Sequence, residues 1–213
     1  MHFLHIGKTG GTAVRTAVEP HTQGGRFYIF LHGHGTLLKD VPVGEGVVFF
    51  LRDPVTRFVS AFNSRLRQGQ PRYFMPWAPV EKIIFERFPT ANALALALSS
   101  AIADERAAAE AAMLAIGHIR KRYAHWLGSE TDFRARLPDI FFIGFQETLA
   151  ADFERLKIKL ELPAAVALPA DEVAAHRTPA NFDQKLTPPA VENLRHWYRD
   201  DLRFYQLCQQ LAP

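Results

Sequence analysis

A glycine-rich loop near the start of the chain has the residue types of an anion-binding site. The stretch HIGKTGGTAVR, residues 5 to 15, places Lys8 and the hydroxyl groups of Thr9 and Thr12 among three glycines. Glycines let backbone amides approach a ligand without an intervening side chain, and the first turn of a following helix adds further amides. An ammonium group and hydroxyl donors favour a phosphate or a chemically similar group. The loop is therefore predicted to bind a phosphate-like anion.

The segments on either side of this loop predict how it is held. Residues 3 to 6 form a short apolar run typical of a buried strand, and residues 12 to 18 can begin a helix. The order is then strand, tight loop, helix. Glycine-rich turns also follow strands in many proteins without binding anything, and a single lysine in such a turn is often only solvated. A second motif is needed to choose between these interpretations.

The second motif is VVFFLRDPVTRFVSAF, residues 47 to 62. An apolar strand ends at Arg52, and Pro54 suits the first turn of the helix that follows, where its missing amide costs little. Ser60 lies roughly two helical turns further on. A guanidinium group at the carboxyl edge of a sheet and a hydroxyl group on the next helix could converge on one anion. Taken singly, each residue is better explained by an ordinary role, in which Arg52 pairs with its neighbours and Ser60 is a common helix serine.

Together, HIGKTGGTAV (5 to 14) and RDPVTRFVSAF (52 to 62) resemble the signature pair of the carbohydrate-type sulfotransferases, which use 3'-phosphoadenosine 5'-phosphosulfate (PAPS) as sulfuryl donor. The resemblance implies that Arg52 and Ser60 hold the 3'-phosphate of PAPS. It also places Lys8 beside the oxygen that bridges phosphate and sulfate. The residues that it assigns to the 5'-phosphosulfate are Lys8, Thr9, Gly10, Gly11 and Thr12.

Two later segments extend the resemblance over most of the chain. FIGFQETLAADFERL (142 to 156) is similar to a later strand and helix of the family, and YRDDLRFYQLC (198 to 208) is similar to its closing helix. The family usually has proline where Gly7 stands, which bears on the stiffness of the loop rather than on its chemistry. Arg177 falls where family members often fold a loop over the nucleotide, although an arginine before a Thr-Pro turn is also commonly just solvated.

Two histidines follow the second expected strand, in FLHGHGTLL (30 to 38). A neutral imidazole suits a general base near neutral pH, so His34 or His32 is expected to take the proton of the acceptor. The sequence favours His34, because His32 is still leaving the strand. Two histidines without a third nearby ligand do not predict a zinc site, and no metal is expected.

Alternation of strands and helices predicts an α/β fold, a P-loop-like parallel sheet flanked by helices. We expect one sulfotransferase domain over residues 1 to 213, with a helical insertion at about 68 to 139. Strands are expected at 27 to 31, 47 to 51 and 140 to 145. Helices are expected at 55 to 67, at 91 to 126 as two helices joined near Ala103, at 149 to 162 and at 189 to 211.

The composition narrows the classes of function. Among 213 residues, 48% are hydrophobic and 12% aromatic, which is typical of a globular protein. The net charge of +3 is small and its arginines are dispersed, so nucleic-acid binding is not predicted. Cys208 is the single cysteine, which excludes an internal disulfide and favours a reducing compartment. Because charged residues interrupt the most apolar stretch and no signal peptide is evident, we expect a cytoplasmic protein without membrane insertion. The oligomeric state is left open.

The acceptor is expected to be a hydroxyl-bearing glycan or small molecule, with a carbohydrate favoured by the resemblance. Tyr73, Trp77, Arg65 and Arg67 could line its site or form an ordinary packed loop. A kinase or nucleoside triphosphatase is the main alternative, but His2 occupies the position of the first glycine that its loop requires. A non-catalytic protein of the same fold that binds a nucleotide or a glycan is the third interpretation.

Overall fold

The computed structural model describes residues 1–23, 25–171, 173, 178–179 and 182–212. The chain divides into two compact units, each with its own core. The first unit comprises Met1–Asp53, Arg122–His176 and Arg203–Pro213, and the second comprises Pro54–Lys121 and Arg177–Leu202. The expectation of a single domain stays a prediction.

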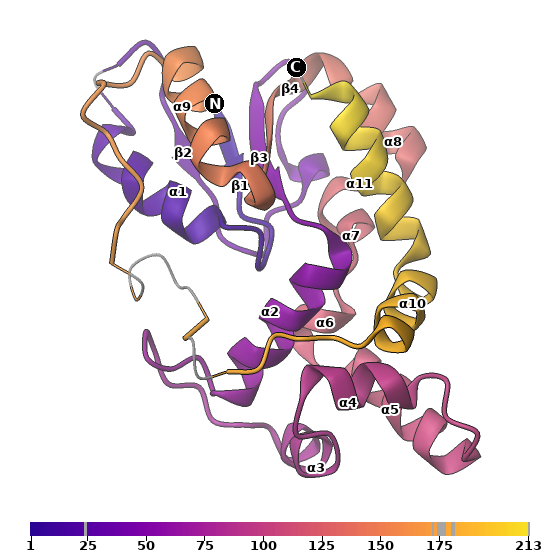
Figure 1. Ribbon diagram of the computed structural model, residues 1–213. Coiled ribbons are helices and arrows are strands. Elements are labelled where there is room, and N and C mark those ends of the chain that lie inside the picture. The colour runs from indigo at the N-terminus through magenta and orange to yellow at the C-terminus, as the bar shows by residue number, and fades with distance from the viewer. Residues whose placement is uncertain (24, 172, 174–177, 180–181, 213) are drawn as a thin grey trace. The chain divides into compact units, whose positions relative to one another are not determined.

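The first unit is built on a four-stranded sheet in which every strand pair is parallel (Figure 1). The strand order is β2-β1-β3-β4, so the second strand in sequence lies at an edge. An α/β fold with a parallel sheet flanked by helices is therefore confirmed. The strands are β1 (His2–Leu4), β2 (Phe30–Leu31), β3 (Val47–Leu51) and β4 (Ile140–Phe145).

Alternate side chains of β3 face the two cores of this unit. Val48 and Phe50 pack with residues of α1 (Gly11–Val18) and α9 (Leu149–Leu160) on one face of the sheet. Val47, Phe49 and Leu51 pack on the other face. That face is covered by α7 (Tyr123–Leu127), α8 (Glu130–Ala135) and the part of α11 (Arg199–Leu211) that belongs to this unit, as Figure 1 shows. Burial on both faces explains why β3 reads as an unbroken apolar run.

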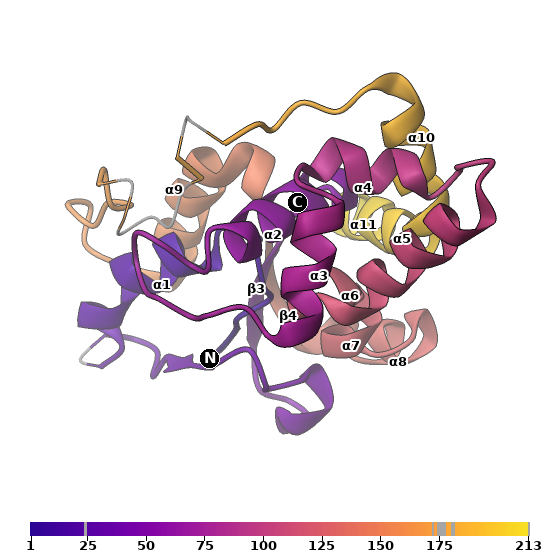
Figure 2. The same ribbon diagram turned by 90° about the horizontal axis from the view of Figure 1, so that it is seen from below.

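The second unit is helical in its described residues, and its helices are seen in Figure 2. Helix α2 begins directly after the corner that follows β3, and it packs against α4, α6 and α10. Buried aromatic side chains such as Phe58, Phe62 and Phe85 form the centre of this core. The helices are α2 (Pro54–Leu66), α3 (Pro79–Arg87), α4 (Ala91–Ala97), α5 (Ala103–Ala115), α6 (Gly117–Arg120) and α10 (Pro188–Trp197).

The second strand is shorter than predicted. The expected run was 27 to 31, whereas β2 contains only Phe30 and Leu31. Its neighbour β1 begins at His2, which pairs with Phe30, so the residues before Phe30 extend past the start of their partner strand. Strand length is set here by the partner rather than by the apolar run. The predicted strands at 47 to 51 and 140 to 145 are confirmed.

Two predicted helices are divided. The expected helix at 189 to 211 is two helices, α10 and α11, which meet at Tyr198; its buried hydroxyl group donates to the carbonyl oxygen of Ile119 at 3.1 Å. The second half of the alanine-rich region also contains breaks, since Ile116 and Lys121 have extended backbone conformations. No strand occurs between residues 68 and 139, all of which are described. Among the helices of the described ranges, none has the length and apolar character needed to cross a membrane.

Candidate functional site

The glycine-rich loop between β1 and α1 has an unusual backbone. Lys8 has a φ of 68°, in the left-handed region that non-glycine residues seldom adopt, and Gly10 has a φ of 83°. A bulky residue held in this conformation costs free energy and is characteristic of binding loops. The same loop packs on the start of α9, because a methyl group at Gly10 would lie 3.1 Å from Cδ2 of Leu149.

Side chains inside the loop fix its shape. The hydroxyl group of Thr9, which is buried, donates to the carbonyl oxygen of Ile6 at 2.9 Å. Gly11 lies against the ring of His5, and a methyl group there would approach Cδ2 of that ring to 2.9 Å. Thr12 places its hydroxyl group 3.5 Å from Nε2 of His5. Thr9 therefore contributes to the geometry of the loop through its side chain, while Thr12 is half-buried at the start of α1.

Backbone amides are available where α1 begins. Gly10 is the residue before the helix and has no capping side chain, and its carbonyl oxygen accepts from the amide of Ala13 at 3.0 Å. Within the described part of the chain, the amides of Gly11 and Thr12 donate to no protein group. Such amides at a helix N-terminus, with the positive end of the helix dipole, can bind an anion.

The corner after β3 is held from two sides. The hydroxyl group of Tyr123 is hydrogen-bonded to the backbone amide and carbonyl groups of Arg52. The next amide, that of Asp53, donates to Oε1 of Glu147 at 2.9 Å, and Tyr205 donates its hydroxyl proton to the other oxygen of Glu147 at 3.0 Å. Burial, and then the charge of Glu147, raise the pKa of Tyr205 far above its usual value. Since β1 and β3 are parallel neighbours, Arg52 and the glycine-rich loop leave the sheet at the same edge.

His34 is exposed, and its Nδ1 bonds to a backbone group. This nitrogen lies 2.8 Å from the carbonyl oxygen of His5, so Nδ1 carries a proton. The rings of His34 and His5 are 4.0 Å apart. The backbone of His34 is also held, because the indole nitrogen of Trp126 donates to its carbonyl oxygen at 3.0 Å.

His32 is half-buried and contacts a different histidine. Its Nε2 lies 2.8 Å from Nδ1 of His2, and Nε2 of His2 lies 2.5 Å from a carboxylate oxygen of Glu45. The carbonyl oxygen of His32 accepts from Arg15 of α1 at 3.1 Å. Burial lowers the pKa of His32, and the nearby charges of His2 and Arg15 lower it further. His34 is thus positioned by a backbone carbonyl group, and His32 is positioned by the imidazole ring of His2.

The sequence also predicts roles for Ser60 and Arg177, and it leaves two interpretations for Arg65 and Trp77. Ser60 is half-buried on α2 in the second unit, and Arg177 lies outside the described residues. Arg65, in the last turn of α2, is buried and forms an ion pair with Glu81 at 2.6 Å. Trp77, in the loop that follows α2, donates its indole proton to the carbonyl oxygen of Arg65. The packed-loop interpretation therefore applies to Arg65 and Trp77.

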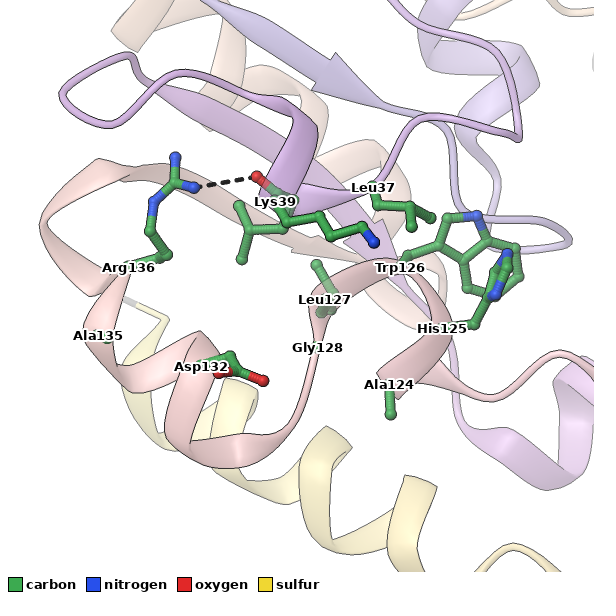
Figure 3. Close-up of a pocket in the computed structure, with 11 residues that line it drawn as sticks. Leu37, Lys39, Ala124, His125, Trp126, Leu127, Gly128, Asp132, Ala135 and Arg136 are labelled. Carbon is green, nitrogen blue, oxygen red and sulfur yellow. Dashed lines mark hydrogen bonds between the residues drawn. The ribbon is translucent and has the colours of Figure 1, made fainter.

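A cavity of about 580 Å³ opens in the first unit beside the segment that carries His34 (Figure 3). Figure 3 shows the Lys39 side chain extending along it toward Trp126, whose indole group is bonded to His34. Arg136 forms a wall, because its guanidinium group is occupied by Asp139 and by carbonyl oxygens. A cavity of this size can hold a small molecule or a sugar unit. Its lining residues are Leu37, Leu38, Lys39, Ala124, His125, Trp126, Leu127, Gly128, Asp132, Ala135 and Arg136.

Sequence reasoning missed the residues that hold the site in place. Tyr123, Glu147, His2 and Glu45 received no role, although Glu147 lies inside a segment already linked to a family pattern. Within the described ranges, no group of three or more His, Cys, Asp or Glu side chains could hold a metal ion. None of the protein-family models, curated proteins or solved structures compared with this chain matches it.

Proposed function

We propose that this protein is a PAPS-dependent sulfotransferase with a P-loop-like fold, which transfers a sulfuryl group to a hydroxyl acceptor. The observation that carries the proposal is the shared position of the Lys8 loop and Arg52 at one edge of a parallel sheet. Ligands of open α/β sheets bind at this carboxyl edge. The two motifs supply positive charge, hydroxyl groups and backbone amides there, which is what a donor with two separated anionic groups requires.

The described residues divide between the two ends of the donor. The 5'-phosphosulfate is bound by Lys8, Thr12 and the amides of Gly10 and Gly11. Thr9 stabilises the loop through the hydrogen bond of its hydroxyl group to Ile6. Arg52 binds the 3'-phosphate with its guanidinium group, and the backbone of Arg52 is held by the hydroxyl group of Tyr123. The roles that the resemblance gives to Ser60 and Arg177 stay sequence-based predictions.

The reaction is an in-line displacement at sulfur. The acceptor oxygen forms a bond to sulfur while the bond from sulfur to the bridging oxygen breaks, and the electron pair of that bond stays on the departing phosphate. Lys8 stabilises the negative charge that develops there. The acceptor hydroxyl proton goes to a neutral histidine after β2, for which His34 and His32 are the two candidates.

The cavity beside His34 is the place that we propose for the acceptor. A hydroxyl-bearing molecule bound there would lie next to the histidine segment, since Trp126 borders the cavity and bonds to His34. Lys39 has no ion pair among the described residues and would suit an anionic group on the acceptor. A glycan or a small hydroxylated molecule meets these requirements.

Thermal unfolding with nucleotides tests the proposal. Adenosine 3',5'-bisphosphate at 100 times its Kd, without added metal, should raise the Tm by about 5 to 10 °C. Adenosine 5'-phosphate and ATP with magnesium should raise it less, because both lack the 3'-phosphate that Arg52 addresses. The Arg52→Ala variant is the matched control and should lose most of the difference between the bisphosphate and adenosine 5'-phosphate. A larger shift with ATP and magnesium would instead favour a kinase or nucleoside triphosphatase.

An activity assay distinguishes a sulfotransferase from a non-catalytic protein of the same fold. Labelled PAPS offered with sugars, glycolipids and phenols should give a sulfated product. Bisphosphate binding without transfer to any acceptor would favour a non-catalytic protein of the same fold.

A further inference from the structure

Glu45, His2 and His32 form a continuous chain of hydrogen bonds in the first unit. His2 is in the middle, with its side chain only 10% exposed, and both of its ring nitrogens are engaged. Glu45 is at one end with a half-exposed carboxylate, and His32 is at the other. Neither the donor-binding roles nor the cavity uses this chain.

The sheet brings these three residues together. His2 begins β1, His32 directly follows the edge strand β2, and Glu45 lies in the turn before β3. The amide of His32 donates to the carbonyl oxygen of Phe3, which keeps His32 in register beside β1. The ring of His2 stacks with that of Phe30 at a centroid distance of 4.9 Å, and it is nearly parallel to the ring of His32, whose centroid lies 5.1 Å away. The three side chains are therefore held by backbone pairing and by stacking as well as by their own hydrogen bonds.

When Glu45 is ionised and His2 is neutral, the hydrogen bonds fix the position of each proton along the chain. An ionised Glu45 only accepts, so Nε2 of His2 carries a proton and its Nδ1 has a lone pair. That lone pair requires a proton on Nε2 of His32, which leaves Nδ1 of His32 unprotonated. No protein group is bonded to this atom in the described ranges. The chain thus presents one basic nitrogen at the end of β2.

The same bonds can carry a proton from one end to the other. When Nδ1 of His32 binds a proton, its Nε2 proton can pass to Nδ1 of His2, and the Nε2 proton of His2 can pass to Glu45. Each bond then has the opposite direction but stays intact, and one proton has moved to the half-exposed carboxylate. Glu45 can release it to water. After the product leaves, the reverse shift, in which Glu45 takes a proton from water and Nδ1 of His32 releases one, restores the first tautomers of both rings.

We propose that Glu45, His2 and His32 form a proton wire that takes the acceptor's proton at His32 and delivers it to solvent at Glu45. This inference rests on the proposed function, because the sulfated hydroxyl group is the source of the proton. It makes His32 the catalytic base and makes His2 and Glu45 positioning residues, which act through it. His34 is bonded through its Nδ1 to the backbone carbonyl oxygen of His5.

The charges around the chain suit this role. Arg15 of α1 bonds to the backbone of His32. Burial lowers the pKa of the terminal amino group of Met1, and the nearby Glu45 carboxylate opposes that shift. Burial, His2 and Arg15 lower the pKa of His32, so its ring stays neutral and able to accept a proton at neutral pH. Among the described residues, Glu45 is the carboxylate that bonds to His2.

Nitrogen NMR of the imidazole rings tests the chain without any acceptor. At pH 7.5 both His2 and His32 should be protonated at Nε2 and bare at Nδ1. In Glu45→Gln the side-chain amide can either accept from or donate to Nε2 of His2 and cannot be protonated at that pH, so the tautomers of both rings are no longer fixed and their nitrogen signals should move toward those of a tautomer mixture. A proton on Nδ1 of His32 at neutral pH in the unaltered protein, or nitrogen signals unchanged by Glu45→Gln, would overturn the proposal.

The turnover of variants tests whether catalysis uses this chain of hydrogen bonds. Glu45→Gln should lower turnover by about tenfold, less than the roughly hundredfold loss of a general base, and should leave bisphosphate affinity unchanged. His2→Phe keeps an aromatic ring at this position and removes both ring nitrogens, so its turnover should fall by as much as that of Glu45→Gln. Glu154→Gln, which removes an exposed carboxylate from α9, is the control. A larger loss in His34→Gln than in His32→Gln would assign the base to His34 and overturn the wire. If the unaltered protein does not bind the bisphosphate, the proposed function is contradicted. The NMR result would then still show whether the chain of hydrogen bonds has the proposed protonation.

Discussion

The hydroxyl group of Tyr123 bonds to both backbone groups of Arg52, the amide at 3.2 Å and the carbonyl oxygen. Tyr123 begins α7, 71 residues further along the chain, and its side chain is buried. One hydroxyl group thus sets the direction in which the chain leaves β3. The position of the Arg52 side chain at the edge of the sheet depends on that direction.

Removal of this hydroxyl group should affect both stability and binding. Tyr123→Phe keeps the buried ring and deletes two hydrogen bonds, so the free energy of unfolding should fall by about 1 to 2 kcal/mol. Bisphosphate affinity should also fall, because Arg52 is less well positioned. Urea unfolding and calorimetric titration would measure the two effects. Tyr28→Phe, at a residue that is 70% exposed, is the control and should change neither.

Arg52 itself should matter for binding. Arg52→Ala should weaken bisphosphate affinity by about 1.5 to 3 kcal/mol, the scale of a lost hydrogen bond to a charged group. The affinity for adenosine 5'-phosphate should change far less, because that nucleotide lacks the 3'-phosphate. Equal losses for the two nucleotides in calorimetric titrations would remove the 3'-phosphate from the role of Arg52.

Lys8 should matter for turnover more than for binding. Its special interaction is with negative charge that appears on the bridging oxygen during transfer, so Lys8→Ala should lower kcat more than it lowers bisphosphate affinity. Alanine and lysine meet similar strain at a φ of 68°, which makes the comparison fair for the loop backbone. Single-turnover transfer and bisphosphate titration give the two numbers. Matching losses would argue against a role at the leaving group.

The sequence predicts the parts of this structure that depend on local pattern. The runs at 47 to 51 and 140 to 145 are apolar throughout because β3 and most of β4 are buried, and the corner at Pro54 starts α2 within one residue of the expected position. The length of β2 and the break at Tyr198 depend on partners that are distant in the chain. Local periodicity carries no information about those partners.

The candidate site divides in the same way. Lys8 and Arg52 are visible from residue type and from their positions at strand ends. Their supports, Tyr123 and Glu147, approach the corner from 71 and 94 residues away, and nothing in the local sequence marks them. The contact between His2 and His32 needs the register of β1 against β2, in which His2 pairs with Phe30. Tertiary pairing, rather than residue type, makes Tyr123, Glu147 and His2 part of the site.

The single cysteine offers a probe of the first unit. Cys208 on α11 is fully buried, and burial raises the pKa of its thiol to about 12. At pH 8 only about one native thiol in ten thousand is then ionised, so alkylation by iodoacetamide should require opening of this core. The labelling rate should rise with low urea concentrations in proportion to unfolding, and mass spectrometry would follow it. A rate equal to that of glutathione without denaturant would show that the thiol is accessible.

The buried pair of Arg65 and Glu81 should dominate the stability of the second unit. Arg65 donates two hydrogen bonds to Glu81, at 2.6 and 2.8 Å, and also bonds to the carbonyl oxygens of Met75 and Pro76. Arg65→Ala leaves a buried carboxylate without its partner, so unfolding should become easier by about 3 to 5 kcal/mol. Replacing both residues together with methionine should cost much less, because no charge is then left buried alone. Urea unfolding of the single and double variants makes the comparison.

The same pair predicts a pH dependence. Burial would raise the pKa of Glu81, but hydrogen bonds from Arg65 and from the amide of Ala78 outweigh it, and the pKa lies below its usual 4.5. A carboxylate with a lowered pKa stabilises the folded state fully above its unfolded value and loses that contribution as pH falls through the folded value. The melting temperature should therefore drop below pH 4.5, and Glu81→Gln should flatten that part of the profile while lying lower at pH 7. An unchanged acid limb in Glu81→Gln would show that other carboxylates determine it.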